Sequence, residues 1–482
     1  MHPILFRIPL PQMPLKLWWA LLAASVIALG YAAMGARQKD RQAVLGSLVM
    51  AGLAAGAGFY WRSVTYQATH LPIYSYGVML GLSLVIGWYL TLTLADRDGL
   101  PRETMANCYV ITAFAAIVGA RVLYIVTNLP EFEDDKHQQL EFAKMLSFRS
   151  GGLVAYGGFL GGYLGSWAYL ASHRIRLMAW ADTVVPSLAS GLLVTRIGCY
   201  LFGCDFGKRL ADGAPGWLRK LGTFPHWAQG TLEHGDGSPA YIRHLEMFRG
   251  SALETQLVSS NASFPVHPTQ LYESLVGLGL LGLLLWQRKT TRFRGQVFFL
   301  FAFAYGFLRF LLETLRDDAE RGEYGPSLAE HVMVPGCLLL MSIGFVFGIS
   351  LGIPNLQARL VARVMAFIPP VVAYVMLKPP SFGQSFNVQL STSQGIGVVS
   401  ALLVSFFYAK MWEEGRRHPA LAMALGDGVD ASSDKEVEAT EEVGQADEAD
   451  DKDEDEAVVV QGSGKKKGLK KREAKADGTE NP

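Results

Sequence analysis

The feature that most constrains this chain is a series of apolar stretches, each close to the ~20 residues that a helix needs to cross a membrane. Eleven stretches qualify or come close, and they run near 16–34, 43–61, 72–94, 107–127, 153–171, 180–202, 270–286, 294–311, 332–351, 361–378 and 394–410. Half of the 482 residues are hydrophobic and 18% are charged, which is too little charge for an ordinary soluble chain. Since lipid leaves backbone groups no partner but their own helix, the sequence predicts an all-α polytopic membrane protein.

Basic residues fall in alternate loops between these stretches. They gather at 37–41, 97–102, 174–176, 288–294, 359–363 and 410–417. Short loops rich in Lys and Arg stay in the cytoplasm, so we expect an external N-terminus and a cytoplasmic C-terminus. The opening MHPILFRIPLPQ lacks the basic and apolar pattern of a cleavable signal peptide, and we expect none.

Two segments outside the apolar stretches differ in kind. Residues 203–269 form the largest external segment, and we expect a small external subdomain there. Residues 416–482 contain an acidic run and then a basic run, which predicts a disordered cytoplasmic tail. The Lys cluster of this tail could contact anionic lipid, although a solubilising tail without a specific partner is the simpler interpretation.

Polar side chains gather at the outer ends of the predicted spans. They are Tyr74, Tyr76, Arg121, Tyr156, Arg196, His267, Gln270, Tyr272, Glu273, Tyr305, Arg309, Glu313 and Arg316. Ionisable groups at membrane depth are costly and usually mark a site. Because chance would place about half of these residues at the inner ends, their convergence on one side predicts a functional site there.

The spacing of these residues indicates what the site binds. Arg309 and Glu313 are four apart on one helix face, as are Tyr305 and Arg309, so the carboxylate can hold the guanidinium. Arginines at headgroup depth suit a phosphate diester, whose oxygens they bind bidentately. Gly157 and Gly158 permit close approach of a backbone or an acyl chain, although such repeats more often serve helix packing.

Several of these residues have a simpler explanation. Interfacial tyrosines such as Tyr74 and Tyr272 often belong only to an aromatic belt. Arg316 could extend to the headgroups and do no more. The four cysteines, Cys108, Cys199, Cys204 and Cys337, show no metal or disulfide spacing in the sequence. We therefore expect neither a metal nor a cofactor.

Four segments resemble the successive signatures of the prolipoprotein diacylglyceryl transferase family. They are GGLVAYGGFLGG, RIGCYLFGCDFG, VHPTQLYES and YGFLRFLLETLR, in that order along the chain. The resemblance covers about 3–12, 71–326 and 389–410. It implies a seven-span core in which 71–202, 270–326 and 389–415 carry the spans. Segments 14–70 and 327–388 would then be inserted helical hairpins, and 1–13 an external N-terminal segment.

The resemblance also implies an activity. The family transfers the diacylglyceryl group of phosphatidylglycerol to the lipobox cysteine thiol of a prelipoprotein, on the outer side of the bacterial inner membrane. Its expected partners are therefore phosphatidylglycerol, prelipoprotein signal peptides and the membrane, with no nucleic acid. By resemblance, Arg196 binds the headgroup, and Arg309 with Glu313 forms a second cationic position. The other expected substrate-binding residues are Tyr76, Arg121, Gly157, Gly158, Gly207, Gln270, Tyr272, Glu273 and Tyr305.

The chain departs from the family pattern at three positions. Many members have His at the position of Tyr156, Asn at that of Cys199 and Glu at that of Cys204. A phenol holds its proton at neutral pH, so Tyr156 would need help to act as a base. We expect His267 to remove the thiol proton and Tyr156 to orient the lipid, with the reverse assignment as the alternative.

Two other functions are consistent with parts of the sequence. A catalytically impaired paralogue would bind phospholipid or lipoprotein without turnover, and Tyr156 is the feature that favours it. A transporter would show inverted repeats and charged residues at mid-bilayer, and the sequence shows neither. The enzyme is the function that the order of the motifs favours.

Overall fold

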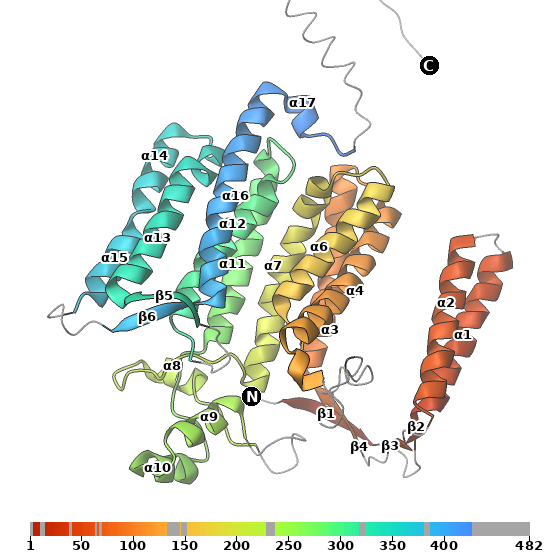
Figure 1. Cartoon of the computed structure of the whole chain (residues 1–482), viewed down its shortest axis with the longest axis horizontal. Coiled ribbons are helices and arrows are strands. Elements are labelled where there is room, and N and C mark those ends of the chain that lie inside the picture. The colour runs from red at the N-terminus through yellow and green to blue at the C-terminus, as the bar shows by residue number, and fades with distance from the viewer. Residues whose placement is uncertain are drawn as a thin grey trace, which may run out of the picture. The chain divides into compact units, whose positions relative to one another are not determined.

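Each apolar stretch predicted as a span is helical in the computed structural model (Figure 1). The structure describes residues 3–9, 15–37, 41–62, 65–66, 70–132, 145, 152–227, 237–317, 323–379 and 386–426. The acidic and basic runs of the predicted tail lie outside these residues, as does the rest of the chain from 427 onward. The long helices are α1 (Leu17–Arg37), α2 (Arg41–Tyr60), α3 (Ser75–Asp98), α4 (Arg102–Thr127), α6 (Ala155–Ser172), α7 (Leu177–Phe202), α11 (Thr269–Gln287), α12 (Gln296–Glu313), α13 (Glu330–Phe347) and α16 (Thr392–Arg417).

By length and composition, nine helical segments among the described residues can cross a membrane. The expected count of about eleven is therefore only partly confirmed. In α2 the apolar part is Val44–Tyr60, which is shorter than the nine candidate spans. Helix α6 has 18 residues, and its glycines dilute its apolar character. The structure thus supports a multi-pass helical membrane protein.

The stretch near 361–378 is not one continuous helix. It forms α14 (Leu356–Met365) and α15 (Ile368–Leu377), which together are long and apolar enough for one span. Pro369 and Pro370 stand in the first turn of α15. Since proline has no backbone N–H to donate, a helix tends to restart where two prolines stand together.

Three small antiparallel sheets accompany the helices, which a purely α-helical prediction did not include. Strand β1 (Ile4–Pro9) pairs with β4 (His70–Tyr74), β2 (Leu15–Lys16) with β3 (Thr65–Tyr66), and β5 (Glu323–Ala329) with β6 (Asn387–Ser391). The pairs β1–β4 and β2–β3 enclose α1 and α2 in the sequence, and β5–β6 encloses α13, α14 and α15 (Figure 1). The chain therefore returns to its starting point after each group of helices.

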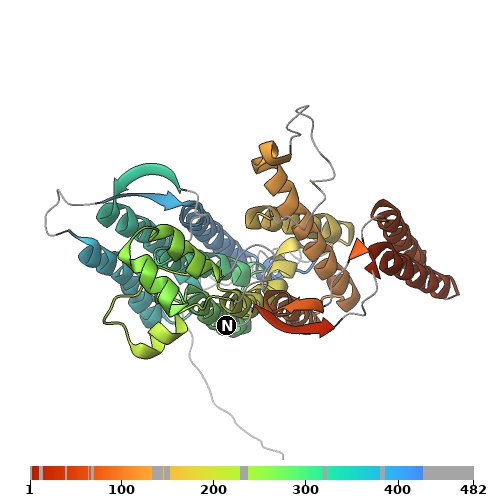
Figure 2. The ribbon, with the colours of Figure 1, turned by 90° about the horizontal axis from the view of Figure 1, so that it is seen from below.

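The segment between α7 and α11 contains three short helices, which no helical period in the sequence predicted. They are α8 (Gly216–Leu221), α9 (Pro239–Met247) and α10 (Ala252–Ser260), and they cover part of the bundle when it is seen from that end (Figure 2). Ser238 caps α9 by accepting a hydrogen bond from the Tyr241 N–H at 3.4 Å. Buried Tyr241, Leu257 and Phe264 form a small core of their own.

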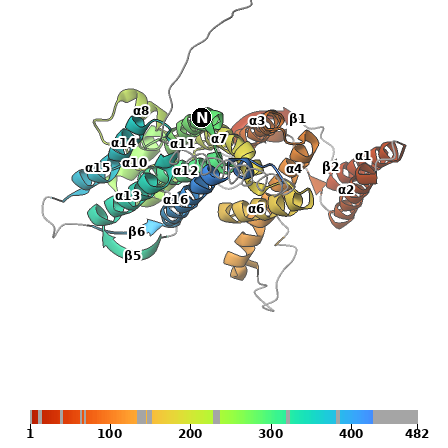
Figure 3. The same ribbon diagram turned by 90° about the horizontal axis from the view of Figure 1, so that it is seen from above.

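The buried apolar residues connect neighbouring helices. One cluster joins α12, α13 and α16 through residues such as Phe303, Met341 and Tyr408. Another joins α7, α11 and α12 through Val185, Leu280 and Val297. Seen along the helices, α7 lies beside both α3 and α11 (Figure 3). The C-terminal end of α7 and the N-terminal end of α11 therefore meet.

At the opposite end, charged side chains bind one another and the backbone. Asp98 accepts hydrogen bonds from Arg288 at 2.8 Å and from Arg294 at 3.4 Å. The buried Asp182 carboxylate accepts from the N–H groups of Gly295 at 2.7 Å and Phe298 at 2.9 Å, at the start of α12. We call Asp98, Asp182, Arg288 and Arg294 the inner network, after the side of the membrane that the sequence predicts for this end.

The described chain extends beyond the predicted start of the tail. After α16 it forms the short helix α17 (Pro419–Ala422). The Arg176 N–H donates to the Leu425 carbonyl at 2.9 Å, and the Arg176 side chain donates to the Leu421 carbonyl at 2.7 Å. Residues up to 426 therefore pack against the start of α7.

Candidate functional site

Three helix ends and one turn build the candidate site. The turn that follows α7 bonds to the backbone before α11, where the Gly207 N–H donates to the His267 carbonyl at 2.9 Å. It also bonds to the end of α12, where the Lys208 N–H donates to the Leu315 carbonyl at 2.7 Å. A Cβ atom at Gly207 would lie 2.7 Å from the His267 Cβ and 2.7 Å from the Leu315 carbonyl oxygen. Gly207 therefore allows the three segments to approach closely.

Asp205 joins two arginines from different helices. One carboxylate oxygen lies 2.5 Å from Nη1 of Arg196 in α7, and the other lies 2.6 Å from Nη2 of Arg316. The two oxygens of one anion thus bind two guanidinium groups. Burial by itself raises the pKa of Asp205, but Arg196 and Arg316 outweigh it and hold this pKa below its usual range. Asp205 is therefore ionised at neutral pH.

Glu273 in α11 is the second anion that joins helices. Its side chain is 3% exposed and pairs with Arg196 and with Arg309 of α12. Arg309 also pairs with Glu313 at 2.9 Å, as the four-residue spacing predicted. The Arg316 Nη1 lies 4.0 Å from the Glu273 carboxylate. We call the six residues Arg196, Asp205, Glu273, Arg309, Glu313 and Arg316 the outer network, after the side of the membrane that the sequence predicts for this end.

The outer network contains three cations and three anions, so its formal charges balance. The side chains of Arg196 and Arg309 are 16% and 14% exposed, and that of Asp205 is 31% exposed. Charges held this far from water are stable only while paired. An incoming anion must therefore replace one of the carboxylates rather than bind to unpaired arginines.

Two neighbouring residues of α11 hold the turn in place. The Thr269 hydroxyl donates to the Asp205 carbonyl at 2.5 Å, and the Gln270 side chain donates to the Cys204 carbonyl. Gln270 is fully buried, and its Oε1 atom has no hydrogen-bond partner among the described residues. Gln270 therefore keeps one free acceptor inside the site.

Three tyrosines predicted for the site lie around the network. Tyr305 in α12 lies near the charged side chains of Arg309, Glu273 and Arg196. It also lies near Tyr156. Tyr76 in α3 lies in the same way near Arg196 and Asp205. The Tyr156 hydroxyl of α6 lies 3.4 Å from the Ser393 hydroxyl of α16. The structure therefore brings these tyrosines to the edge of the network.

His267 and Tyr272 form a separate pair before and within the first turn of α11. The Nδ1 atom of His267 lies 3.3 Å from the Tyr272 hydroxyl. Partial burial lowers the pKa of His267 from its ordinary value. Its imidazole is thus neutral at neutral pH and can accept a proton.

Three other residues predicted for substrate binding lie elsewhere. Arg121 donates from Nε to the Met145 carbonyl at 2.9 Å and from Nη1 to the Gly152 carbonyl at 3.0 Å. A Cβ at Gly157 would lie 2.3 Å from the Gly119 carbonyl of α4, and one at Gly158 would lie 3.4 Å from the Ala116 carbonyl. Both glycines therefore face α4, and a role in substrate binding stays a prediction.

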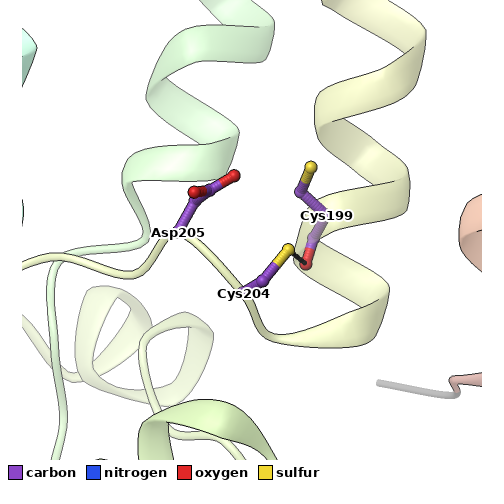
Figure 4. A group of neighbouring side chains, drawn as sticks. All are labelled: Cys199, Cys204 and Asp205. Carbon is purple, nitrogen blue, oxygen red and sulfur yellow. Dashed lines mark hydrogen bonds between the residues drawn. The ribbon is translucent and has the colours of Figure 1, made fainter. Parts of the chain in front are cut away.

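One cluster of side chains at the site was not predicted from the sequence. Cys199, Cys204 and Asp205 lie together at the end of α7, with their ligand atoms all within 4.8 Å of one another (Figure 4). The spacing of the cysteines predicted neither a metal site nor a disulfide, and this stays a prediction, although three possible ligand atoms lie close together in the fold. The glycine before Cys204 could have revealed this proximity, since a glycine that ends a helix folds the next residue back over the last turn.

Comparisons with known proteins agree on one family. The family described as prolipoprotein diacylglyceryl transferase matches residues 63–360, which is more than half of the chain. The match includes α3 to α13 and thus every member of the outer network.

Curated relatives carry the same description. A phosphatidylglycerol–prolipoprotein diacylglyceryl transferase 2 of Clostridium perfringens is 29% identical over 266 residues, which is 55% of this chain and 86% of the relative. The transferase of Clostridium tetani is 25% identical over 53% of this chain and 86% of the relative. That of Bacillus cytotoxicus is 28% identical over 58% and 90%. These relatives are thus matched over nearly their whole length.

Proposed function

Because the chain belongs to the prolipoprotein diacylglyceryl transferase family, we propose that it transfers the diacylglyceryl group of phosphatidylglycerol to the lipobox cysteine of prelipoproteins. The names of the curated relatives support this activity. In the proposed step, a thiol attacks the glyceryl carbon that bears the phosphate, and glycerol phosphate leaves. The site must therefore bind a phosphate diester, remove a thiol proton and stabilise the departing phosphate.

The observation that carries the proposal is the position of Asp205 between Arg196 and Arg316. A carboxylate whose two oxygens bind two guanidinium groups occupies the place that two phosphate oxygens would take. Asp205 is the most exposed member of these two ion pairs, so it is the anion that a headgroup can displace most easily. Arg196 then holds the phosphate, as the resemblance implied.

Arg309 supplies the second cationic position. Glu273 and Glu313 hold its guanidinium from two helices, so it keeps its place when the headgroup enters. A fixed cation stabilises charge that develops on the departing phosphate without first having to reorganise. Gln270, Tyr76 and Tyr305 complete the surroundings and orient the lipid.

We assign proton removal to His267, whose neutral imidazole suits a general base. Tyr156 of α6 directs its hydroxyl group to α16 and orients the lipid through it. Gly157, Gly158, Gly207, Tyr272 and Arg121 support the site through the backbone and the neighbouring helices.

We place this site on the outer side of the bacterial inner membrane, with the C-terminus in the cytoplasm. The distribution of basic loops supports this orientation. Reporter fusions at 235 should then report an external position, and fusions after residue 415 a cytoplasmic one. An external C-terminus would reverse the orientation.

A second candidate function is favoured by Tyr156 alone. A paralogue without turnover would bind phosphatidylglycerol or a lipoprotein through the same arginines. Such a protein would retain phosphatidylglycerol when purified but would never produce glycerol phosphate.

Complementation tests the proposal directly. The chain should restore growth and lipoprotein maturation in a strain depleted of its transferase. Purified protein should release glycerol phosphate from phosphatidylglycerol only in the presence of a lipobox peptide. The Arg196→Lys variant should keep little transfer activity, because a point charge cannot replace the planar guanidinium group. A folded chain that binds phosphatidylglycerol but fails both assays would support the paralogue instead.

A further inference from the structure

Two cysteines meet where α7 ends, beside the outer network. Gly203 follows the last helical residue with φ of 85°, and its N–H donates to the Cys199 carbonyl at 2.7 Å. A glycine in this conformation brings the next residue against the residue five positions earlier. Cys204 therefore lies over Cys199, and its thiol is directed to the Cys199 carbonyl (Figure 4).

The third member of the group is Asp205. Its backbone has φ of 56°, which is uncommon outside glycine although Asp tolerates it better than most residues. This turn brings a carboxylate to the same side as the two thiols (Figure 4). Cys199 is buried, whereas Cys204 and Asp205 are partly exposed, so the group can be reached from outside.

We propose that Cys199, Cys204 and Asp205 bind a zinc ion whose open position receives the lipobox thiol of the prelipoprotein. The inference rests on the proposed transferase function and adds a metal to it. Catalytic zinc sites have three protein ligands and leave one position for water or substrate. Two sulfur ligands favour zinc over magnesium or calcium, which prefer oxygen.

The charges of the site permit this cation. The outer network is already balanced, with three arginines and three carboxylates. Zinc brings two positive charges, and the two cysteine thiols lose two protons when they bind it. The net charge of the site is thus the same before and after loading.

Headgroup binding then prepares the third ligand. In the structure the Asp205 carboxylate pairs with Arg196 and Arg316. When the phosphate takes these two guanidinium groups, the carboxylate becomes available to the ion. Phosphatidylglycerol should therefore strengthen zinc binding, and zinc should strengthen binding of phosphatidylglycerol to the same extent.

A metal also answers the need for an ionised thiol. The side chains of Tyr156 and His267 contact Ser393 and Tyr272, respectively, which are not members of the outer network. A thiol that binds a zinc ion loses its proton outright. The lipobox thiol would bind as a thiolate, and its proton would pass to water or to His267.

The bonds and charges of the step balance. The bound thiolate sulfur forms a bond to the glyceryl carbon, and the bond from that carbon to the phosphate oxygen breaks. The electron pair stays on the phosphate oxygen, and glycerol phosphate departs from Arg196 and Arg309. The product is a neutral thioether, which is a weak ligand for zinc and so leaves the ion. No oxidant or reductant takes part.

Cobalt gives a readout of the metal site that does not depend on activity. Full-length protein in nanodiscs that contain phosphatidylglycerol, stripped with a chelator and kept reduced with a phosphine, is titrated with Co²⁺. We expect one equivalent to produce a thiolate-to-cobalt charge-transfer band that Zn²⁺ abolishes. The Cys199→Ser and Cys204→Ser variants should lose the band. The matched control Cys108→Ser, whose thiol lies in α4, should keep it. Absence of the band from the unaltered protein would overturn the site.

Transfer assays test the role of the ion and separate the two proposals. The metal-free protein should transfer at least about tenfold more slowly than the zinc-loaded protein, because a bound metal replaces an unaided thiol ionisation. Equal rates with and without zinc would overturn the catalytic role and leave the transferase function standing. A cobalt band in a protein that transfers nothing in either state would support the metal site and contradict the transferase function.

Discussion

The two ends of the helix bundle each carry a charged network, and the two networks use their charges differently. In the inner network, the protein backbone takes up much of the bonding capacity. Asp182 accepts from two backbone N–H groups, and Arg288 also donates to the Asp182 carbonyl at 2.6 Å. In the outer network the ion pairs link one charged side chain to another. Asp205 bridges two arginines, and Glu273 pairs with two.

This difference indicates which end can exchange a partner. A charge bound to the backbone of its own fold cannot be released without disturbing a helix end. A charge bound to another side chain can turn to a ligand, provided that the ligand replaces the lost charge. The outer network is therefore suited to a reaction and the inner network to structure. The predictions below begin with the largest expected effect.

Paired arginine variants should separate the two networks most strongly. Arg196→Ala should lower transfer by about a thousandfold, because it removes a preorganised donor to the phosphate. Arg288→Ala should leave the rate of transfer per folded molecule unchanged, although it removes a partner of Asp98. Release of glycerol phosphate, normalised to folded protein by size-exclusion chromatography, measures both. Equal losses of activity would abolish the distinction.

Variants of His267 and Tyr156 test which of these two residues accepts the thiol proton. His267→Ala should lower transfer by about a hundredfold if the imidazole is the general base. Tyr156→Phe should keep partial activity, and Tyr156→His should be active. Rates at several pH values measure the effect, because loss of a base also changes the pH profile. An inactive Tyr156→Phe beside a fully active His267→Asn would give the role to the tyrosine.

An inner variant should affect stability alone. Asp182→Asn keeps one acceptor oxygen, so one of the two N–H groups at the start of α12 loses its partner. The free energy of unfolding should fall by about 1–3 kcal/mol. Thermal unfolding in detergent measures this change, and transfer below the unfolding temperature should stay normal. A variant that is as stable as the original chain but slow in transfer would link the inner network to function.

A pH effect should be confined to the segment between α7 and α11. Burial, and then Arg209 and Arg243, lower the pKa of His244 to about 4. The Phe264 N–H donates to its Nδ1 at 3.2 Å, and protonation would remove that acceptor. Since the unfolded histidine titrates near 6.5, the contribution to stability is complete above that pH and is lost as the pH falls toward 4. His244→Gln should flatten this part of the pH dependence of thermal unfolding, and an unchanged slope would assign it to other groups.

Much of the helical architecture could be predicted because it depends on local sequence. The apolar stretches are helical in the structure. Arg309 and Glu313, which are four residues apart, form the ion pair that their spacing predicted. The pairs of Glu273 with Arg196 and Arg309 could not be predicted from spacing, because they join helices far apart in sequence. The polar residues predicted to converge at one end include Arg196, Glu273 and Arg309, which ion pairs join in the structure, and their role in binding stays a prediction.

Position along a helix did not determine which face a residue occupies. Arg121 lies toward the same end as the network residues, yet its side chain is bound to the carbonyls of Met145 and Gly152. For Arg316 the sequence left two possibilities open, a place in the polar cluster or extension to the headgroups, and in the structure it pairs with Asp205. Both outcomes depend on the loops, whose course no periodicity describes.

The pairing of β1 with β4 has a practical consequence for α1 and α2, the helices between them. Strands β1 and β4 hydrogen-bond to each other on either side of α1 and α2, so the chain ends of this segment are held together by the ladder itself. The described core clusters include residues of α13 but none of α1 or α2. The segment between β1 and β4 is therefore a suitable place to insert an affinity tag or a second membrane module. We expect such an insertion to leave the path of the chain on either side unchanged.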